Sequence, residues 1–125
     1  MQRNPVGWFE IPVNDMNRAV KFYETVFGFK LELHKMGPVD MAWFPMLQDK
    51  EGAAGTLAKG EGYKPSHEGT LVYFTAHSGD LNNELSKVKD AGGKILAEKF
   101  SIGEHGFVGL VEDTEGNRIA IHSMK

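Results

Sequence analysis

The chain repeats one pattern at an offset of 65 residues, and this repeat limits the available folds more than any other feature. In each copy an aspartate is followed by an apolar stripe at helical spacing and then by a glycine. The positions are Asp15, Met16, Val20, Tyr23, Val26 and Gly28 in the first copy, and Asp80, Leu81, Leu85, Val88, Ala91 and Gly93 in the second. Because aspartate favours a helix N-cap and glycine a helix end, the pattern predicts helices over residues 15–27 and 80–91.

The segments around the two helices have the alternation and composition that are typical of strands. The expected strands cover residues 6–13, 29–34, 42–47 and 53–59 in the first copy, and 71–76, 94–98, 107–112 and 118–123 in the second. The predicted class is therefore α+β, with two tandem βαβββ modules forming mixed sheets around a cleft. The modules span about residues 5–60 and 69–125 of a single 125-residue domain, and residues 60–69 form the linker.

Composition and charge exclude several function classes. The net charge of −3 gives no electrostatic reason to bind nucleic acid or an anionic membrane, and no apolar run is long enough to span a bilayer. Cysteine is absent, so disulfides, thiolate nucleophiles and thiolate metal sites are ruled out. Residues 1–5 lack the apolar core of a signal peptide, and we expect a cytoplasmic protein.

One face of each sheet packs on its own helix, so the opposite face needs cover from the other module, a ligand or another chain. In the first strand, alternation places Trp8 and Glu10 on this opposite face. The full set of residues expected there is Trp8, Glu10, Tyr73, Thr75, Ala120 and His122. These residues are predicted to line a concave surface.

Three sequences resemble the vicinal oxygen chelate superfamily: VNDM at residues 13–16, FYETVFGF at 22–29 and EDTEGNRI at 112–119. That superfamily includes glyoxalases, bleomycin-resistance proteins, fosfomycin-modifying enzymes and extradiol dioxygenases. The resemblance implies paired βαβββ modules, a homodimer, and a divalent metal held in the cleft by up to four His, Glu or Gln side chains. It implies no single reaction, because members of the superfamily perform many chemistries.

The metal-ligand positions that the resemblance implies are filled by other residue types. They fall on Trp8 and Thr56 in the first module and on Leu71 and Ala120 in the second. A divalent metal needs imidazole or carboxylate donors, and these four side chains offer one weak hydroxyl. We therefore expect no metal cofactor, unless a displaced site binds Zn, Ni, Mn or Fe.

Glu10 and His122 are the candidate catalytic residues. Each lies two residues beyond a vacated metal position, so strand alternation returns it to the cleft side. Such a pair could transfer protons, orient a ligand or bind a displaced metal; the alternatives are a polar pair that satisfies itself and two surface groups. Solvated positions are expected for the remaining histidines, His34, His67, His77 and His105.

Aromatic side chains give a second functional signal, because flat apolar walls suit a planar ligand. The predicted ligand-binding residues are Trp8, Trp43, Thr56, Leu71, Tyr73, Thr75, Phe107 and Ala120. The first hypothesis is a homodimeric, glyoxalase-like protein that binds a small organic molecule without the metal. The second is a lyase, isomerase or dioxygenase that uses a displaced metal or the Glu10 and His122 pair. The third is a structural or protein-interaction role in which a second chain fills the cleft.

Overall fold

The computed structural model describes residues 4–125 as two successive βαβββ modules. The first module consists of β1 (Trp8–Pro12), α1 (Met16–Phe27), β2 (Glu32–Met36), β3 (Val39–Trp43) and β4 (Ala54–Lys59). The second consists of β5 (Val72–Thr75), α2 (Leu81–Val88), β6 (Lys94–Ser101), the 3-10 turn η1 (Gly103–His105), β7 (Phe107–Glu112) and β8 (Arg118–Ser123). The predicted α+β class with two tandem modules is confirmed.

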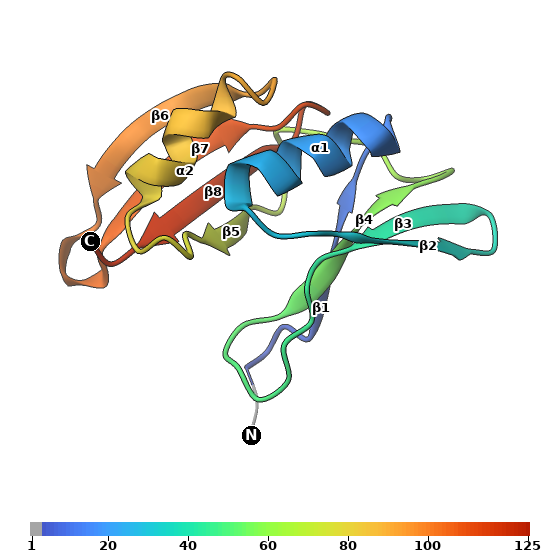
Figure 1. The fold of residues 1–125 in the computed structure, drawn as a ribbon, viewed down its shortest axis with the longest axis horizontal. Helices are drawn as coiled ribbons and strands as arrows, with labels where there is room; N and C mark the ends of the chain where they lie inside the picture. The colour runs from blue at the N-terminus through green and yellow to red at the C-terminus, as the bar shows by residue number, and fades with distance from the viewer. Residues whose placement is uncertain (1–3) are drawn as a thin grey trace.

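Each module folds into its own mixed sheet, and the two sheets have the same topology. The strand orders are β1-β4-β3-β2 and β5-β8-β7-β6. In both sheets the first strand pairs in parallel with the last, and the remaining pairs are antiparallel. Both helices lie on the same side of the molecule, next to each other, while the β2–β3 hairpin projects away from them (Figure 1).

Local sequence explains where α1 begins and ends. The carboxylate of Asp15 accepts a hydrogen bond from the amide of Arg18 at 3.0 Å, which satisfies a backbone donor at the helix start. Gly28 adopts a left-handed conformation with φ of 80°, and its amide donates to the carbonyl of Glu24. The repeat also predicted the N-cap of α2, where Asp80 accepts from the amide of Asn82 at 2.9 Å.

An aromatic core joins the two modules. The ring of Phe74, from β5, lies 4.7 Å from that of Phe27 and 5.5 Å from that of Phe44, measured between centroids. Tyr23 lies between Phe44 and Phe74, with centroids 5.5 and 5.6 Å away. Because each buried phenylalanine contributes about 2–3 kcal/mol, this shared cluster makes separation of the modules costly.

Four predicted elements differ most in their bounds from the structure. The strand predicted at 29–34 begins later, and the strand predicted at 42–47 begins earlier, because Gly37 and Pro38 form a tight turn that places Met36 opposite Val39. Pro45 has no amide hydrogen to donate, which fits the end of β3 before it. Helix α2 ends at Val88 rather than 91, where the backbone turns toward Gly92, whose φ is 97°. Strand β6 extends past residue 98 through two register shifts.

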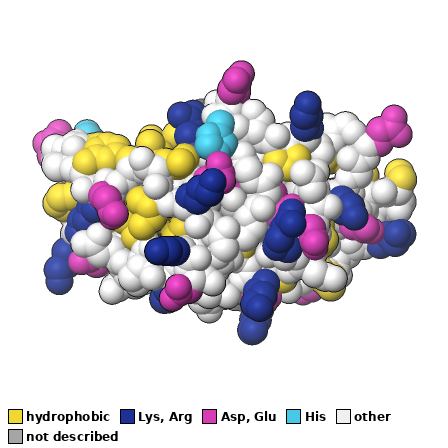
Figure 2. Space-filling model, turned by 90° about the horizontal axis from the view of Figure 1, so that it is seen from above, with side chains coloured by type: hydrophobic (Ala, Val, Ile, Leu, Met, Phe, Trp, Pro, Cys, Tyr) yellow, Lys and Arg dark blue, Asp and Glu magenta, His cyan; other side chains and the backbone are white. Residues whose placement is uncertain are grey.

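The surface shows no concentration of one charge on the face seen from above, where basic and acidic side chains are interspersed (Figure 2). Among residues 4–125, no helix is both long and apolar enough to cross a membrane.

Candidate functional site

Two of the four metal-ligand positions implied by the resemblance are fully buried. Thr56 and Ala120 have no exposed surface, and both lie on strands at the interior of their sheets. The hydroxyl of Thr56 lies 3.0 Å from the carbonyl oxygen of Ala42 and 2.7 Å from that of Leu57, so the backbone already satisfies it. The hydroxyl of Thr56, the one weak metal-binding group among the four positions, is therefore already hydrogen-bonded to the backbone.

The residues present do not fit the divalent metal of the resembled family. Trp8, Leu71 and Ala120 have no donor atom that a divalent cation would bind, and Thr56 is held by backbone carbonyls. Within residues 4–125 no group of three or more His, Asp or Glu side chains is arranged to hold a metal ion. We derive no chemistry through a metal at these positions.

The same face of the first sheet carries three aromatic rings in contact, which we call the aromatic platform: His34, Trp43 and Trp8. The imidazole of His34 stacks on Trp43 with a centroid distance of 3.7 Å and an interplanar angle of 25°. Trp8 meets Trp43 edge to face at 5.7 Å. Strand pairing explains the arrangement, because β4 lies between β1 and β3 and offers the small side chains of Ala54 and Thr56 beneath the indoles.

Trp8 is the accessible ring of the platform, whereas the indole nitrogen of Trp43 is buried. Trp8 retains 38% of its surface exposed, which is high for so large an apolar side chain. Within the described part of the chain, Trp43 Nε1 is buried and lacks a hydrogen-bond partner. A buried donor without an acceptor costs free energy, and native structures seldom leave one unpaired.

The second sheet presents the other predicted residues. Tyr73 pairs with Ala120 and Thr75 with His122, so these four side chains share the face opposite α2. Tyr73 is 58% exposed. The predicted ligand-binding residue Phe107 lies elsewhere: it faces the helix side, contacts the core, and has the ammonium of Lys99 4.5 Å from its ring centroid.

Glu10 and His122 are held by separate partners. Glu10 accepts a hydrogen bond from the hydroxyl of Tyr63 at 2.8 Å, and this bond raises the pKa of Tyr63. His122 Nε2 lies 2.6 Å from the carbonyl oxygen of His105, so Nε2 is the donor in this bond. No hydrogen bond or ion pair joins Glu10 to His122 among the described residues.

Sequence reasoning missed His34 and Tyr63 as members of the site. His34 was expected to be solvated, but it is half-buried against Trp43. Correct bounds for β2 and β3 would have placed His34 and Trp43 on one sheet face. His34 pairs with Met41, which lies two residues before Trp43 and therefore on the same face of β3. Tyr63 lies in the segment between β4 and β5, where no periodicity could have indicated its contact with Glu10.

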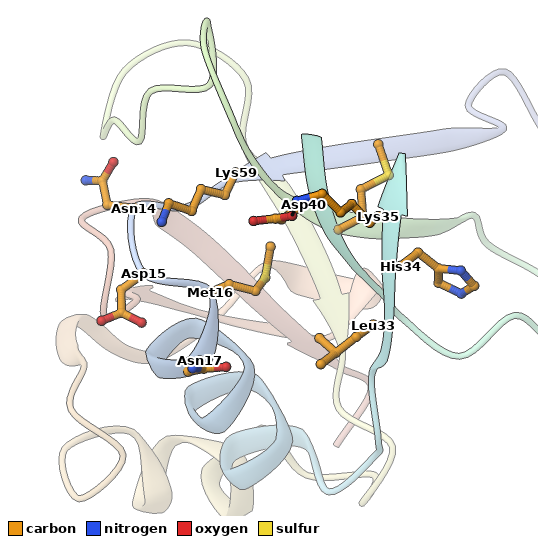
Figure 3. A pocket seen from close by; sticks show the side chains of 10 residues that line it. Asn14, Asp15, Met16, Asn17, Leu33, His34, Lys35, Asp40 and Lys59 are labelled. Atoms are coloured by element: carbon orange, nitrogen blue, oxygen red, sulfur yellow. Dashed lines mark hydrogen bonds and ion pairs between the residues drawn. The ribbon is translucent and has the colours of Figure 1, made fainter. Parts of the chain in front are cut away.

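A cavity of about 660 Å³ lies on the helix side of the first module, and neither Trp8 nor Trp43 lines it. It is bounded by the first turn of α1 and the β2–β3 hairpin. Met16 and Leu33 project into it, whereas His34 projects to the other side of β2 (Figure 3). Four of its ten lining residues are Lys or Asp, and Lys35 Nζ lies 3.2 Å from Asp40 Oδ1. None of the predicted site residues lines it.

Comparison with known proteins identifies the family. The sequence model of the glyoxalase/bleomycin resistance protein/dioxygenase superfamily matches residues 6–121. A glyoxylase-like domain-containing protein from Didymella fabae is 32% identical over 120 residues, covering 93% of this chain and 91% of the relative.

Solved structures with a similar fold include glyoxalase I from Zea mays, with a TM-score of 0.70 and 20% identity over 95% of this chain. The chain covers 46% of that maize protein, less than half its length. TnmS3, an antibiotic binding protein from Streptomyces sp. CB03234, matches with a TM-score of 0.65 and 19% identity, covering 100% of this chain and 99% of its own. From these matches and the shared topology, the chain belongs to the glyoxalase/bleomycin resistance protein/dioxygenase superfamily.

Proposed function

We propose that the protein binds a small organic molecule whose flat, apolar part lies on the aromatic platform, without the divalent metal of its family. The observation that carries this proposal is a group of contacting aromatic rings on the sheet face where the resemblance places metal ligands, with the partly exposed Trp8 at one of those positions. Indole faces provide a large apolar contact and stack well on planar guests. Binding of this kind requires a concave aromatic surface but no reactive group.

A second copy of the chain is the proposed partner that closes the binding cleft. Large apolar side chains are exposed at the far edges of both sheets: Leu33 and Met36 on β2, and Ile95, Leu96 and Phe100 on β6. A surface of this kind is typical of a contact between protein chains. Size-exclusion chromatography with light scattering should give the mass of a homodimer, and a monomer at all concentrations would contradict this part of the proposal.

A relative with a binding role supports the choice of binding over catalysis. TnmS3, which has the same fold over the whole of this chain, is described as an antibiotic binding protein. At 19% identity, the similarity between TnmS3 and this chain shows a common fold and does not identify a ligand. The proposal therefore rests on the platform, and TnmS3 is an example of this fold in an antibiotic binding protein.

Tryptophan fluorescence tests the proposal directly, because the sequence contains two tryptophans and both lie in the platform. Titration with planar aromatic compounds and thiol conjugates should quench or shift the emission in a saturable way. Trp8→Leu should weaken the binding of a positive ligand about tenfold or more, as expected when a stacking indole is lost. Ile102→Ala, at an exposed apolar position outside both the platform and the proposed dimer contact, should leave the affinity unchanged. Equal affinities in the two variants would contradict the proposal.

Metal binding provides the complementary test. Calorimetry with Zn²⁺, Ni²⁺ and Mn²⁺ should show no tight stoichiometric uptake by purified protein. Stoichiometric binding that is lost in Glu10→Gln or His122→Ala would overturn the metal-free proposal and favour a displaced site.

A second candidate function is metal-free proton transfer by His122. The carbonyl of His105 holds the imidazole through Nε2, which leaves Nδ1 as the basic atom of the neutral ring. A positioned imidazole of this kind could act as a general base on a bound ligand. If so, ligand turnover should fall at least about a hundredfold in His122→Ala while ligand affinity stays the same. Turnover that survives this change would exclude the role.

A further inference from the structure

A crevice between the two modules is separate from the platform. It lies between the edge strands β1 and β5 and has a volume of about 210 Å³. Residues 50–54, just before β4 and at its start, form one wall of the crevice, and the end of β5 forms the other. Trp8 and Trp43 do not line it, so a molecule in this crevice would not stack on either indole.

The floor of the crevice consists of phenylalanine rings: Phe9, Phe29, Phe44 and Phe74. Phe44 contacts Phe9 and Phe29 with centroid distances of 5.5 and 5.6 Å. Phe9 and Phe74 meet edge to face at 6.0 Å. Exposed polar side chains, among them Thr75, His77 and Lys50, occupy the mouth. The crevice is thus apolar at its base and of mixed polarity at its entrance, where the exposed side chains of Leu47 and Tyr73 also lie.

The internal repeat explains why space remains here. A second, polar pocket lies at the corresponding position on the other side of the pseudo-dyad, next to residues 117–119. There Asn117 fills the junction and donates a hydrogen bond to the carbonyl of Pro12 at 2.8 Å. The equivalent positions in the first module are Ala53 and Ala54, where the second has Asn117 and Arg118. Short methyl side chains cannot bridge the gap, so the junction on this side stays open and apolar.

We propose that this crevice is a second ligand site, selective for a molecule with one aromatic ring and one polar substituent. Its volume exceeds the roughly 150 Å³ of an apolar cavity known to hold benzene and falls below the roughly 300 Å³ at which drug-sized sites begin. The ring packs on the phenylalanine floor, edge to face with at least one of its rings. The polar substituent points to the mouth, where Thr75 and His77 can hydrogen-bond it.

Phenol is the probe that tests this site, with the wild-type protein followed by amide NMR. Saturable shifts are expected at Ala53, Ala54 and Thr75, with a Kd of about 1 mM, as befits so small a ligand. Tryptophan emission reports the platform separately, so the two proposals can fail independently.

Ala53→Leu supplies the decisive variant, since it adds a side chain inside the crevice from a half-buried loop position and removes no core contact. It should weaken phenol binding about tenfold or more. Gln48→Leu adds the same side chain to the same loop but outside the lining, and should leave the Kd unchanged. Equal binding in wild type and Ala53→Leu, or shifts confined to Trp8 and Trp43, would each overturn the proposal.

Discussion

The two turns that join the last strands of the modules have related sequences and opposite roles. Residues 49–52 read Asp-Lys-Glu-Gly and residues 113–116 read Asp-Thr-Glu-Gly. The first turn is exposed, and no side chain between 48 and 53 makes a hydrogen bond or ion pair within the described chain. In the second turn Asp113 is buried and its Oδ1 accepts from the amides of Glu115 and Asn117, at 2.8 and 2.9 Å.

The second turn also bonds to the first module. The hydroxyl of Tyr23 on α1 donates to Asp113 Oδ2 at 2.6 Å. Glu115 accepts from the amides of Asn14 and Asp15 at the start of α1, at 2.8 and 2.7 Å, and from Arg18 Nε at 2.7 Å. A carboxylate at a helix N-terminus is favourable because it meets unpaired amides and the positive end of the helix dipole.

The difference between the turns follows from the helices that they could meet. At the repeat offset of 65, the positions of Arg18 and Tyr23 on α1 become Asn83 and Val88 on α2, which offer neither a guanidinium nor a hydroxyl. The turn at residues 113–116 therefore bonds the two modules together, because Arg18 and Tyr23 are present as partners. The turn at residues 49–52 lacks such partners and remains exposed to solvent. The comparison indicates that the repeated turn sequence stabilises the packing of the modules in the second copy and makes no such contacts in the first.

The largest expected effect comes from replacing the buried aspartate. Asp113→Ala leaves the Tyr23 hydroxyl and two amides without an acceptor, and should lower the free energy of unfolding by about 3–5 kcal/mol. Asp49→Ala at the equivalent exposed position should change it by no more than about 0.5 kcal/mol. Urea denaturation measures both. Similar losses in the two variants would remove the contrast between the turns.

The contacts of Glu115 with the start of α1 should make the stability of the protein depend on pH. Burial alone would raise the pKa of Glu115, but hydrogen bonds from Arg18 and the amides of Asp15 and Asn14 outweigh it and lower the pKa below 4.5. Because the folded state binds the proton less tightly, this contribution is complete above the unfolded-state pKa and is lost as pH falls through the lowered value.

Glu115→Gln should therefore lower the free energy of unfolding by about 2 kcal/mol at neutral pH, and the difference from wild type should shrink below about pH 4.5. Denaturation series at several pH values measure this difference. Glu51→Gln in the first turn is the control and should follow the wild-type curve. A difference that stays constant with pH would show that the charge of Glu115 does not matter.

A smaller effect is expected at the hydroxyl of Tyr23. Tyr23→Phe keeps the ring in the aromatic core and removes one hydrogen bond to Asp113, so the free energy of unfolding should fall by about 1–2 kcal/mol. Tyr63→Phe removes an exposed hydroxyl bonded to Glu10 and should cost less than about 0.5 kcal/mol. Thermal and urea unfolding of the two variants compare them directly, and a reversed order would contradict the assignment.

The smallest effect concerns the backbone of the first turn. Asp49 has a positive φ of 61°, a conformation that glycine adopts more readily than aspartate. Asp49→Gly should therefore raise the free energy of unfolding by up to about 0.5 kcal/mol, since no side-chain contact is lost. A loss of stability on urea denaturation would mean that the Asp49 side chain takes part in an interaction in solution.

Regular elements were predictable because their signals are local. The N-cap Asp15, the terminal Gly28 and the alternation in residues 107–112 and 118–123 gave the correct bounds for α1, β7 and β8. The bounds of β2 and β3 were wrong because the apolar residues around Phe29 and Leu47 look like strand residues. Phe29 instead packs in the aromatic core outside any strand, and Leu47 lies exposed after Pro45.

The candidate site was predictable as a face but not as a set of contacts. Alternation placed Trp8 and Glu10 on the side opposite the helix, as the pairing of β1 with β4 bears out. The partners of Glu10 and His122 come from Tyr63 and the carbonyl of His105, in segments without regular periodicity. Neither contact could be inferred from sequence, because tertiary folding alone brings these segments to the strands.

The parallel pairing of each opening strand with the closing strand of its module has a consequence for the order of folding. Trp8 is matched with Ala54, and Val72 with Ile119, so neither sheet can be completed from neighbouring hairpins alone. Such distant pairings slow the search for the native state, because a long loop must close before any contact compensates for its lost entropy. During synthesis α1 would leave the ribosome well before Asp113 and Glu115. The hydrogen bonds that join α1 to the second module can therefore form only after the last strands have been made.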